Sequence, residues 1–211
     1  HSIARRQRQM CIRDRVFSIK GTCDLGGKME IRMSVTQIRP NMDFWQERVD
    51  LAAAFRWTAR LNYHEAVANH FSLAINDDGT KFLMNPDQSH FARIKASDII
   101  EVDANNPNTL SGPNAPDPTA WGLHGSLHRR CDHARCAMHV HSIHATVLAS
   151  LKDSRLLPID QNCAAFYNRY VIDDNYGGLA FEDEGERCAT MLQDPKTVSY
   201  THLTLPTSNG V

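Results

Sequence analysis

Residues 71–84 read FSLAINDDGTKFLM, which is the pattern of a β-hairpin. The first part alternates large apolar residues with small or polar ones, as a strand with one buried face does. The segment Asn76–Gly79 predicts the turn, because Asn, Asp and Gly tolerate the backbone angles of tight hairpin turns. Residues 82–84 supply the returning strand. Since a hairpin joins antiparallel strands, we expect a mixed or antiparallel sheet rather than a purely parallel one.

Helical segments flank this hairpin on both sides. Residues 43–62 place apolar side chains near helical spacing, with Asp43 positioned to cap the first turn. Asp117-Pro118 starts another helix, since Asp is a preferred cap and Pro a preferred first residue. That helix carries His124 and His128 on one face, which permits metal ligation, although we favour packing or buried hydrogen bonds. Further elements are expected as a strand at 99–102, a loop at 103–118, and helices at 143–151 and 182–191.

The candidate site begins in residues 136–141, which read CAMHVH and have the apolar character of a buried strand. On a strand, residues two apart point to the same face, so His139 and His141 can reach one metal ion. Zinc in catalytic sites takes three protein ligands and keeps one open position, while iron and manganese also accept imidazole. The alternative is a pair of core histidines that are hydrogen-bonded to the backbone.

The two ends of the chain have an unusual relationship. The DNA string CGTCGGCAGCGTCAGATGTGTATAAGAGAC encodes Arg5–Asp14, and its reverse complement encodes Val198–Thr207. Natural protein ends do not arise from opposite strands of one oligonucleotide, so we expect both to be read-through of a sequencing adapter. The expected organisation is an artefactual or disordered segment at 1–28, a C-terminally truncated domain at 29–197, and an artefactual tail at 198–211.

Removing residues 1–15, with their five arginines and one aspartate, changes the net charge from −1 to −5 for residues 16–197. A mildly acidic chain of this size suits one soluble domain and favours neither nucleic acid nor a membrane as partner. No apolar run approaches the roughly 20 residues of a membrane-spanning helix. The remaining cysteines are odd in number and form no C-x-x-C, which indicates reduced thiols and a cytoplasmic location. They are Cys23, Cys131, Cys136, Cys163 and Cys188.

Five segments, in this order and at this spacing, resemble class II aldolase/adducin domains. They are Ala68-Asn69-His70-Phe71-Ser72, Leu83-Met84-Asn85-Pro86, Ala96-Ser97-Asp98-Ile99, Leu123-His124-Gly125-Ser126-Leu127-His128 and Met138-His139-Val140-His141-Ser142. The resemblance covers roughly residues 45–197. It implies an α/β fold with three α/β/α layers around a mostly antiparallel central sheet, incomplete at the C-terminus.

The resemblance also implies a metal site. Enzyme members of the family bind zinc through three histidines, of which the first two form an H-x-H that matches His139 and His141. The third comes from a His-Gly segment that would follow Thr197, and we expect it to lie beyond the chain. Asn69 matches a substrate-binding position of the family, and His144, just after the H-x-H, is a further candidate for substrate contact.

Two positions depart from the aldolase pattern. Ala120 stands where the aldolases carry a catalytic Glu, and Ala can neither give nor take a proton. Asp87 stands in a segment that holds the substrate phosphate in the aldolases. A carboxylate there would repel phosphate, so Asp87 predicts a substrate without one.

The resemblance therefore predicts a metal-dependent, lyase-type enzyme that acts next to a carbonyl and stabilises an enediolate. Its substrate would be a small hydroxy-carbonyl or sugar-derived molecule, and the full-length protein would be a homotetramer. A dehydratase, epimerase, decarboxylase or oxygenase on the same scaffold stays open, as does a non-catalytic adducin-like interaction module. The truncated chain itself is expected to be inactive.

Overall fold

The computed structural model describes residues 15–23, 29–37, 42–173, 182–193 and 198–201. The chain divides into two compact units, His1–Trp45 and Gln46–Val211. In the first, β1 (Arg15–Cys23) and β2 (Met29–Gln37) form an antiparallel pair. Most of the predicted artefactual ends, residues 1–14 and 202–211, lies outside the described residues. The domain boundaries drawn from the sequence stay predictions.

The second unit is built on a sheet with the strand order β5-β4-β3-β6, in which every neighbouring pair is antiparallel. The hairpin predicted at 71–84 is confirmed, and Gly79 in its turn adopts a positive φ of 68°. The strands are β3 (His70–Ala74), β4 (Lys81–Met84), β5 (Ile100–Asp103) and β6 (Cys136–His139).

Helix α2 (Trp45–Arg60) covers one face of this sheet. Leu51 and Phe55, one helical turn apart, are both buried. The Phe55 ring stacks on Phe71 of β3 with a centroid distance of 4.9 Å. The odd-numbered β3 residues therefore point toward α2, and the even-numbered ones toward the opposite face.

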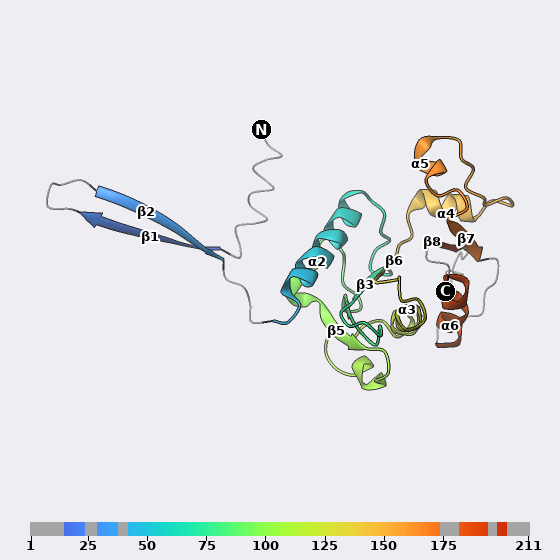
Figure 1. The fold of residues 1–211 in the computed structure, drawn as a ribbon, viewed down its shortest axis with the longest axis horizontal. Helices are drawn as coiled ribbons and strands as arrows, with labels where there is room; N and C mark the ends of the chain where they lie inside the picture. The colour runs from blue at the N-terminus through green and yellow to red at the C-terminus, as the bar shows by residue number, and fades with distance from the viewer. Residues whose placement is uncertain (1–14, 24–28, 38–41, 174–181, 194–197, 202–211) are drawn as a thin grey trace, which may run out of the picture. The chain divides into compact units, whose positions relative to one another are not determined.

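Helix α3 (Pro118–Arg130) covers that opposite face. Asp117 caps it by accepting a hydrogen bond from the Ala120 N–H at 2.9 Å, as predicted. Helix α6 (Glu182–Met191) packs closely on α3, because a Cβ on Gly185 would lie only 2.6 Å from the Gly122 carbonyl oxygen. Figure 1 shows α2 and α3 on opposite sides of the strands. The predicted α/β fold with a mostly antiparallel sheet is confirmed.

The prediction that residues 136–141 form a buried strand was wrong in one respect. In the described part of the sheet β6 is an edge strand that pairs with β3 alone, and its face with Cys136 and Met138 is exposed. Met138 is 56% exposed, whereas His139 points inward. The apolar residues of this segment reflect alternation at an edge rather than burial on both faces.

The remaining described elements follow β6. Two short helices and a parallel strand pair complete the second unit. They are α4 (Ile143–Ala149), α5 (Gln161–Ala164), β7 (Tyr170–Asp173) and β8 (Val198–Thr201), with 3-10 turns at Ala96–Asp98 and Pro107–Leu110 earlier in the chain. Strands β7 and β8 pair in parallel. No helix in the described ranges is long and apolar enough to cross a membrane.

Candidate metal centre

His139 and His141 turn their rings toward one another, as the strand alternation predicted. Their Nε2 atoms lie 3.0 Å apart. Strand β6 ends at His139, so His141 follows the strand directly while keeping its side chain on the same side. Two imidazole nitrogens bound to one tetrahedral zinc ion at about 2.0–2.1 Å would lie about 3.3 Å apart. A zinc ion would therefore fit between the two Nε2 atoms if the rings moved slightly apart.

The other ring nitrogen of each histidine, Nδ1, also has a hydrogen-bond partner. His141 Nδ1 donates a hydrogen bond to Glu65 Oε2 at 2.6 Å, and His139 Nδ1 lies 2.9 Å from His70 Nε2. Glu65 comes from the loop between α2 and β3, and its side chain is 61% exposed. Histidines that bind metals commonly have a carboxylate or another acceptor behind them in this way, because it fixes the ring and its tautomer.

The electrostatics of the pocket favour neutral imidazoles. Burial, together with the neighbouring histidines, lowers the pKa of His139 well below its usual value. Burial and the nearby His141 lower the pKa of His70 to about 3. Neutral imidazole is the form that donates a lone pair to a metal ion, so these shifts suit ligation.

A buried polar network lies behind His139, between the sheet and α3. Ser72 Oγ contacts His128 Nε2 at 2.7 Å and His124 Nδ1 at 2.5 Å. His124 Nε2 lies 2.7 Å from His70 Nδ1, which extends the series to His139. We call the series His128, Ser72, His124, His70 and His139 the histidine network. It confirms the interpretation of His124 and His128 as buried, hydrogen-bonded residues.

Sequence reasoning missed Glu65, His70 and Ser72 as parts of this site. His70 pairs directly with His139 in the register of β3 and β6. Alternation along residues 70–74 would have placed His70 and Ser72 on the face opposite the apolar side chains. Glu65 lies in an irregular loop, and no pattern in the sequence indicates its contact with His141.

Asn69 borders the candidate centre. Its side chain is 2% exposed, and its Oδ1 accepts a hydrogen bond from the backbone N–H of Glu65 at 2.5 Å. Within the described part of the chain its Nδ2 is buried without a partner. Asn85 holds the neighbouring backbone by donating to the Asn69 carbonyl oxygen. Since an unmade buried hydrogen bond is costly, the Asn69 amide is suited to a ligand oxygen.

The other candidate residues are placed differently. The carboxylate of Asp87 contacts its neighbour in sequence, since Oδ1 accepts a hydrogen bond from the Gln88 N–H at 2.7 Å. The backbone N–H of Asp87 donates to the carbonyl oxygen of Ala115. His144 is exposed in the first turn of α4. Ala120, at the position of the aldolase catalytic Glu, is fully buried in the core between α3 and the sheet.

A second group of ligand-type side chains lies near α6. Asp173, Glu184 and Cys188 have ligand atoms within 4.8 Å of one another. Arg187 occupies this group, because it forms ion pairs with Asp173 at 2.6 Å and with Glu184 at 2.5 Å. The cluster is a charge-neutralising network rather than a cation site.

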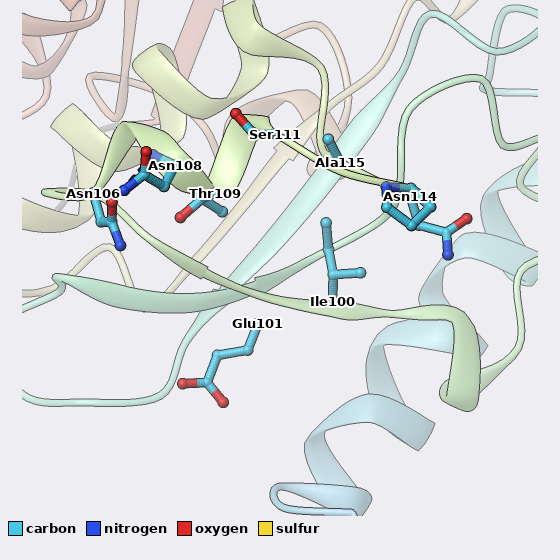
Figure 2. Close-up of a pocket in the computed structure, with 9 residues that line it drawn as sticks. Ile100, Glu101, Asn106, Asn108, Thr109, Ser111, Asn114 and Ala115 are labelled. Carbon is cyan, nitrogen blue, oxygen red and sulfur yellow. Dashed lines mark hydrogen bonds between the residues drawn. The ribbon is translucent and has the colours of Figure 1, made fainter.

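A cavity of about 330 Å³ lies at the opposite edge of the sheet, beside β5. Its lining includes Glu101 together with asparagines of the loop that follows β5, among them Asn106 and Asn114. Figure 2 shows these side chains pointing in different directions rather than converging. The histidines of β3 and β6 are therefore the stronger candidate for chemistry.

Comparison with known proteins identifies the class of this chain. The pattern of the family described as "Class II Aldolase and Adducin N-terminal domain" matches residues 49–202. The chain belongs to this family, as its motifs predicted.

Individual relatives span several activities. A putative aldolase class 2 protein from Caulobacter vibrioides is 30% identical, over 72% of this chain and 59% of that protein. A decarboxylase from Streptomyces niveus is 25% identical, over 70% of this chain and 55% of that protein. The chain thus spans about half the length of the curated relatives it matches.

Solved structures agree with the fold. An aldolase II superfamily protein from Pseudomonas syringae has a TM-score of 0.66 at 25% identity, covering 78% of this chain and 66% of that one. The L-fuculose 1-phosphate aldolase of Glaciozyma antarctica has a TM-score of 0.61 at 20% identity, covering 78% and 65% respectively.

Proposed function

We propose that this chain is part of a metal-dependent, lyase-type enzyme that acts next to a carbonyl group. The observation that carries the proposal is the 3.0 Å approach of the His139 and His141 Nε2 atoms, each ring being hydrogen-bonded through Nδ1. The donor set is two imidazoles, which suits zinc, with iron or manganese as alternatives. The substrate class is a small hydroxy-carbonyl or sugar-derived molecule.

Each residue of the site would have a separate role in this reaction. His139 and His141 hold the metal ion, whose Lewis acidity would polarise a hydroxyl–carbonyl pair and favour the enediolate. Glu65 orients His141 through its 2.6 Å hydrogen bond. The free Nδ2 of Asn69 offers a donor to a substrate oxygen, and His144 and Asp87 are further substrate contacts of this proposal.

The proton-transfer group differs from that of the aldolases. Ala120 is buried and has no titratable group, and His124 and His128 have both ring nitrogens engaged in hydrogen bonds. Glu65 is the carboxylate in contact with the metal-binding pair, and its side chain is largely exposed. We therefore assign proton transfer to Glu65.

A non-catalytic adducin-like interaction module is the second candidate, because the family includes adducins. The loss of the aldolase Glu at Ala120 favours it. The two candidates differ in metal content, since an interaction module does not require a bound ion.

Metal analysis tests the proposal. The purified chain, titrated with zinc chloride, should bind one zinc ion weakly, and His141→Ala should abolish that binding. His133→Ala is the matched control, because His133 is exposed in the loop after α3. Equal zinc binding by both variants would refute the metal centre, and a full-length protein that purifies without metal would favour the interaction module.

We also propose a cytoplasmic homotetramer. The described cysteines Cys131, Cys136, Cys163 and Cys188 are all free, which suits a reducing compartment. Helix α4 exposes an apolar stripe, with Ile143 at 64% and Val147 at 57% exposure. Such a stripe suits a subunit contact, and light scattering of the parent and of Val147→Lys would test the assembly.

A further inference from the structure

The histidine network has a fixed starting point at the backbone. His128 Nδ1 lies 2.7 Å from the carbonyl oxygen of Ala134. A carbonyl oxygen only accepts hydrogen bonds, so Nδ1 of His128 carries a proton. A neutral His128 then accepts at Nε2, and the Ser72 hydroxyl must be the donor. Because that hydroxyl has a single proton, its oxygen accepts from His124, whose Nδ1 is therefore protonated.

The same assignment of donors and acceptors extends from His124 to the metal-binding pair. A neutral His124 accepts at Nε2 from the protonated Nδ1 of His70. His70 in turn accepts at Nε2 from Nδ1 of His139. His139 is thereby left with its proton on Nδ1 and a lone pair on Nε2, which is the atom that faces His141.

Glu65 holds the other ring, that of His141. Its carboxylate accepts a hydrogen bond from Nδ1 of His141, so Nε2 is the ring nitrogen of His141 that faces His139. The Nε2 lone pair of His139 therefore points at Nε2 of His141 across 3.0 Å. His139 can accept a cation at this position but cannot donate a hydrogen bond there.

A second pair of histidines shows that the distance alone does not imply this. His64 Nε2 and His90 Nε2 also lie 3.0 Å apart. Here the N–H of Ala92 donates to Nδ1 of His90, which places the His90 proton on Nε2. His90 can therefore donate to His64, and an ordinary hydrogen bond explains the contact. The two pairs therefore differ in the hydrogen bond at Nδ1, which leaves a proton on Nε2 of His90 and a lone pair on Nε2 of His139.

We propose that the four side chains behind His139 in the histidine network are positioning residues that hold it in the Nδ1-protonated form. They keep the Nε2 lone pair of His139 available to a metal ion without touching that ion themselves. Outer partners of this kind commonly contribute about 10- to 100-fold to metal affinity. The purpose of the network rests on the proposed metal centre, whereas its proton positions are testable without metal.

Long-range ¹H–¹⁵N correlation spectra of the chain with a chelator present test the proton positions. His70, His124 and His128 should each show a protonated Nδ1 and an unprotonated Nε2, the reverse of the form that free histidine prefers. A protonated Nε2 on any of the three would overturn the proposal. This result does not depend on whether a metal ion binds.

Ser72→Ala tests the consequence for the metal. It removes the hydroxyl that links His124 to His128, and it should weaken binding of Co²⁺ or Zn²⁺ by about 10- to 100-fold. Ser126→Ala is the matched control, because Ser126 is an equally buried serine on α3 that bonds to Arg129 instead. Ser126→Ala should bind metal as the parent does.

The outcomes separate the two proposals. Equal metal affinity in Ser72→Ala and Ser126→Ala would overturn the positioning role while leaving the metal centre intact. A parent chain that binds no metal would refute the metal centre, and the spectra would still decide the proton positions. If Ser72→Ala does not fold, the spectra of the parent chain decide the question.

Discussion

Acidification should destabilise this protein steeply, because histidines are buried here without a carboxylate partner. Burial lowers the pKa of His128 from 6.5 to about 4, with the nearby Arg135 lowering it further and the Ala134 carbonyl opposing the shift. Burial, with His70, His128 and His139 nearby, lowers the pKa of His124 well below 6.5. In both cases the unfolded chain binds the proton more tightly than the folded chain does. Their stabilisation is therefore complete above about pH 6.5 and is lost as the pH falls toward the folded pKa.

The magnitude follows from the shift. Between about pH 7.5 and pH 5, a histidine with a folded pKa of about 4 contributes a loss of about 2 kcal/mol. His124, whose pKa is also lowered well below its usual value by burial, should increase this loss further. A typical domain has only about 5–15 kcal/mol in total. Urea unfolding with a chelator present, at both pH values, measures the difference directly.

A variant isolates the source of the effect. His128→Asn keeps a donor for Ala134 but cannot titrate, so it should be less stable than the parent at neutral pH and lose about 2 kcal/mol less on acidification. His133→Asn, at an exposed position, controls for the substitution itself. A free energy of unfolding that stays constant between the two pH values would refute the reasoning, as would an unchanged pH dependence in His128→Asn.

Two substitutions test how the site is supported. A Cβ on Gly79, where φ is 68°, would lie 2.0 Å from the His128 carbonyl oxygen, so Gly79→Ala should cost about 2–5 kcal/mol in urea unfolding. Gly112→Ala, also at positive φ but with no atom within 4 Å, should cost clearly less, and equal losses would contradict the packing argument. Asp117→Ala removes the cap of α3 and should cost about 1 kcal/mol in the same measurement. A thermal melt of Asp117→Ala that coincides with the parent's would show that the cap is not needed.

Local signals predicted much of the fold. The turn at Asn76–Gly79 and the Asp117-Pro118 helix start depend on residues close in sequence, and both occur where expected. The helix predicted at 182–191 has the same bounds in the structure. Alternation also placed His139 and His141 on one side, and their Nε2 atoms meet.

Features that depend on distant residues were not predicted. Burial of residues 136–141 was overestimated, because the sequence does not tell whether a strand lies inside a sheet or at its edge. His70 reaches His139 through the register of β3 with β6, and Ser72 connects to α3 only once that helix lies across the sheet. Glu65 contacts His141 from a loop, across 76 positions of sequence. These contacts are set by packing rather than by local pattern.

A crystal structure of the chain soaked in excess zinc, with anomalous data collected at the zinc edge, would show whether His139 and His141 hold a metal ion together. We expect one anomalous peak about 2.0–2.1 Å from the Nε2 atoms of both His139 and His141. A peak at the Asp173 cluster alone, or none between the two imidazoles, would contradict it.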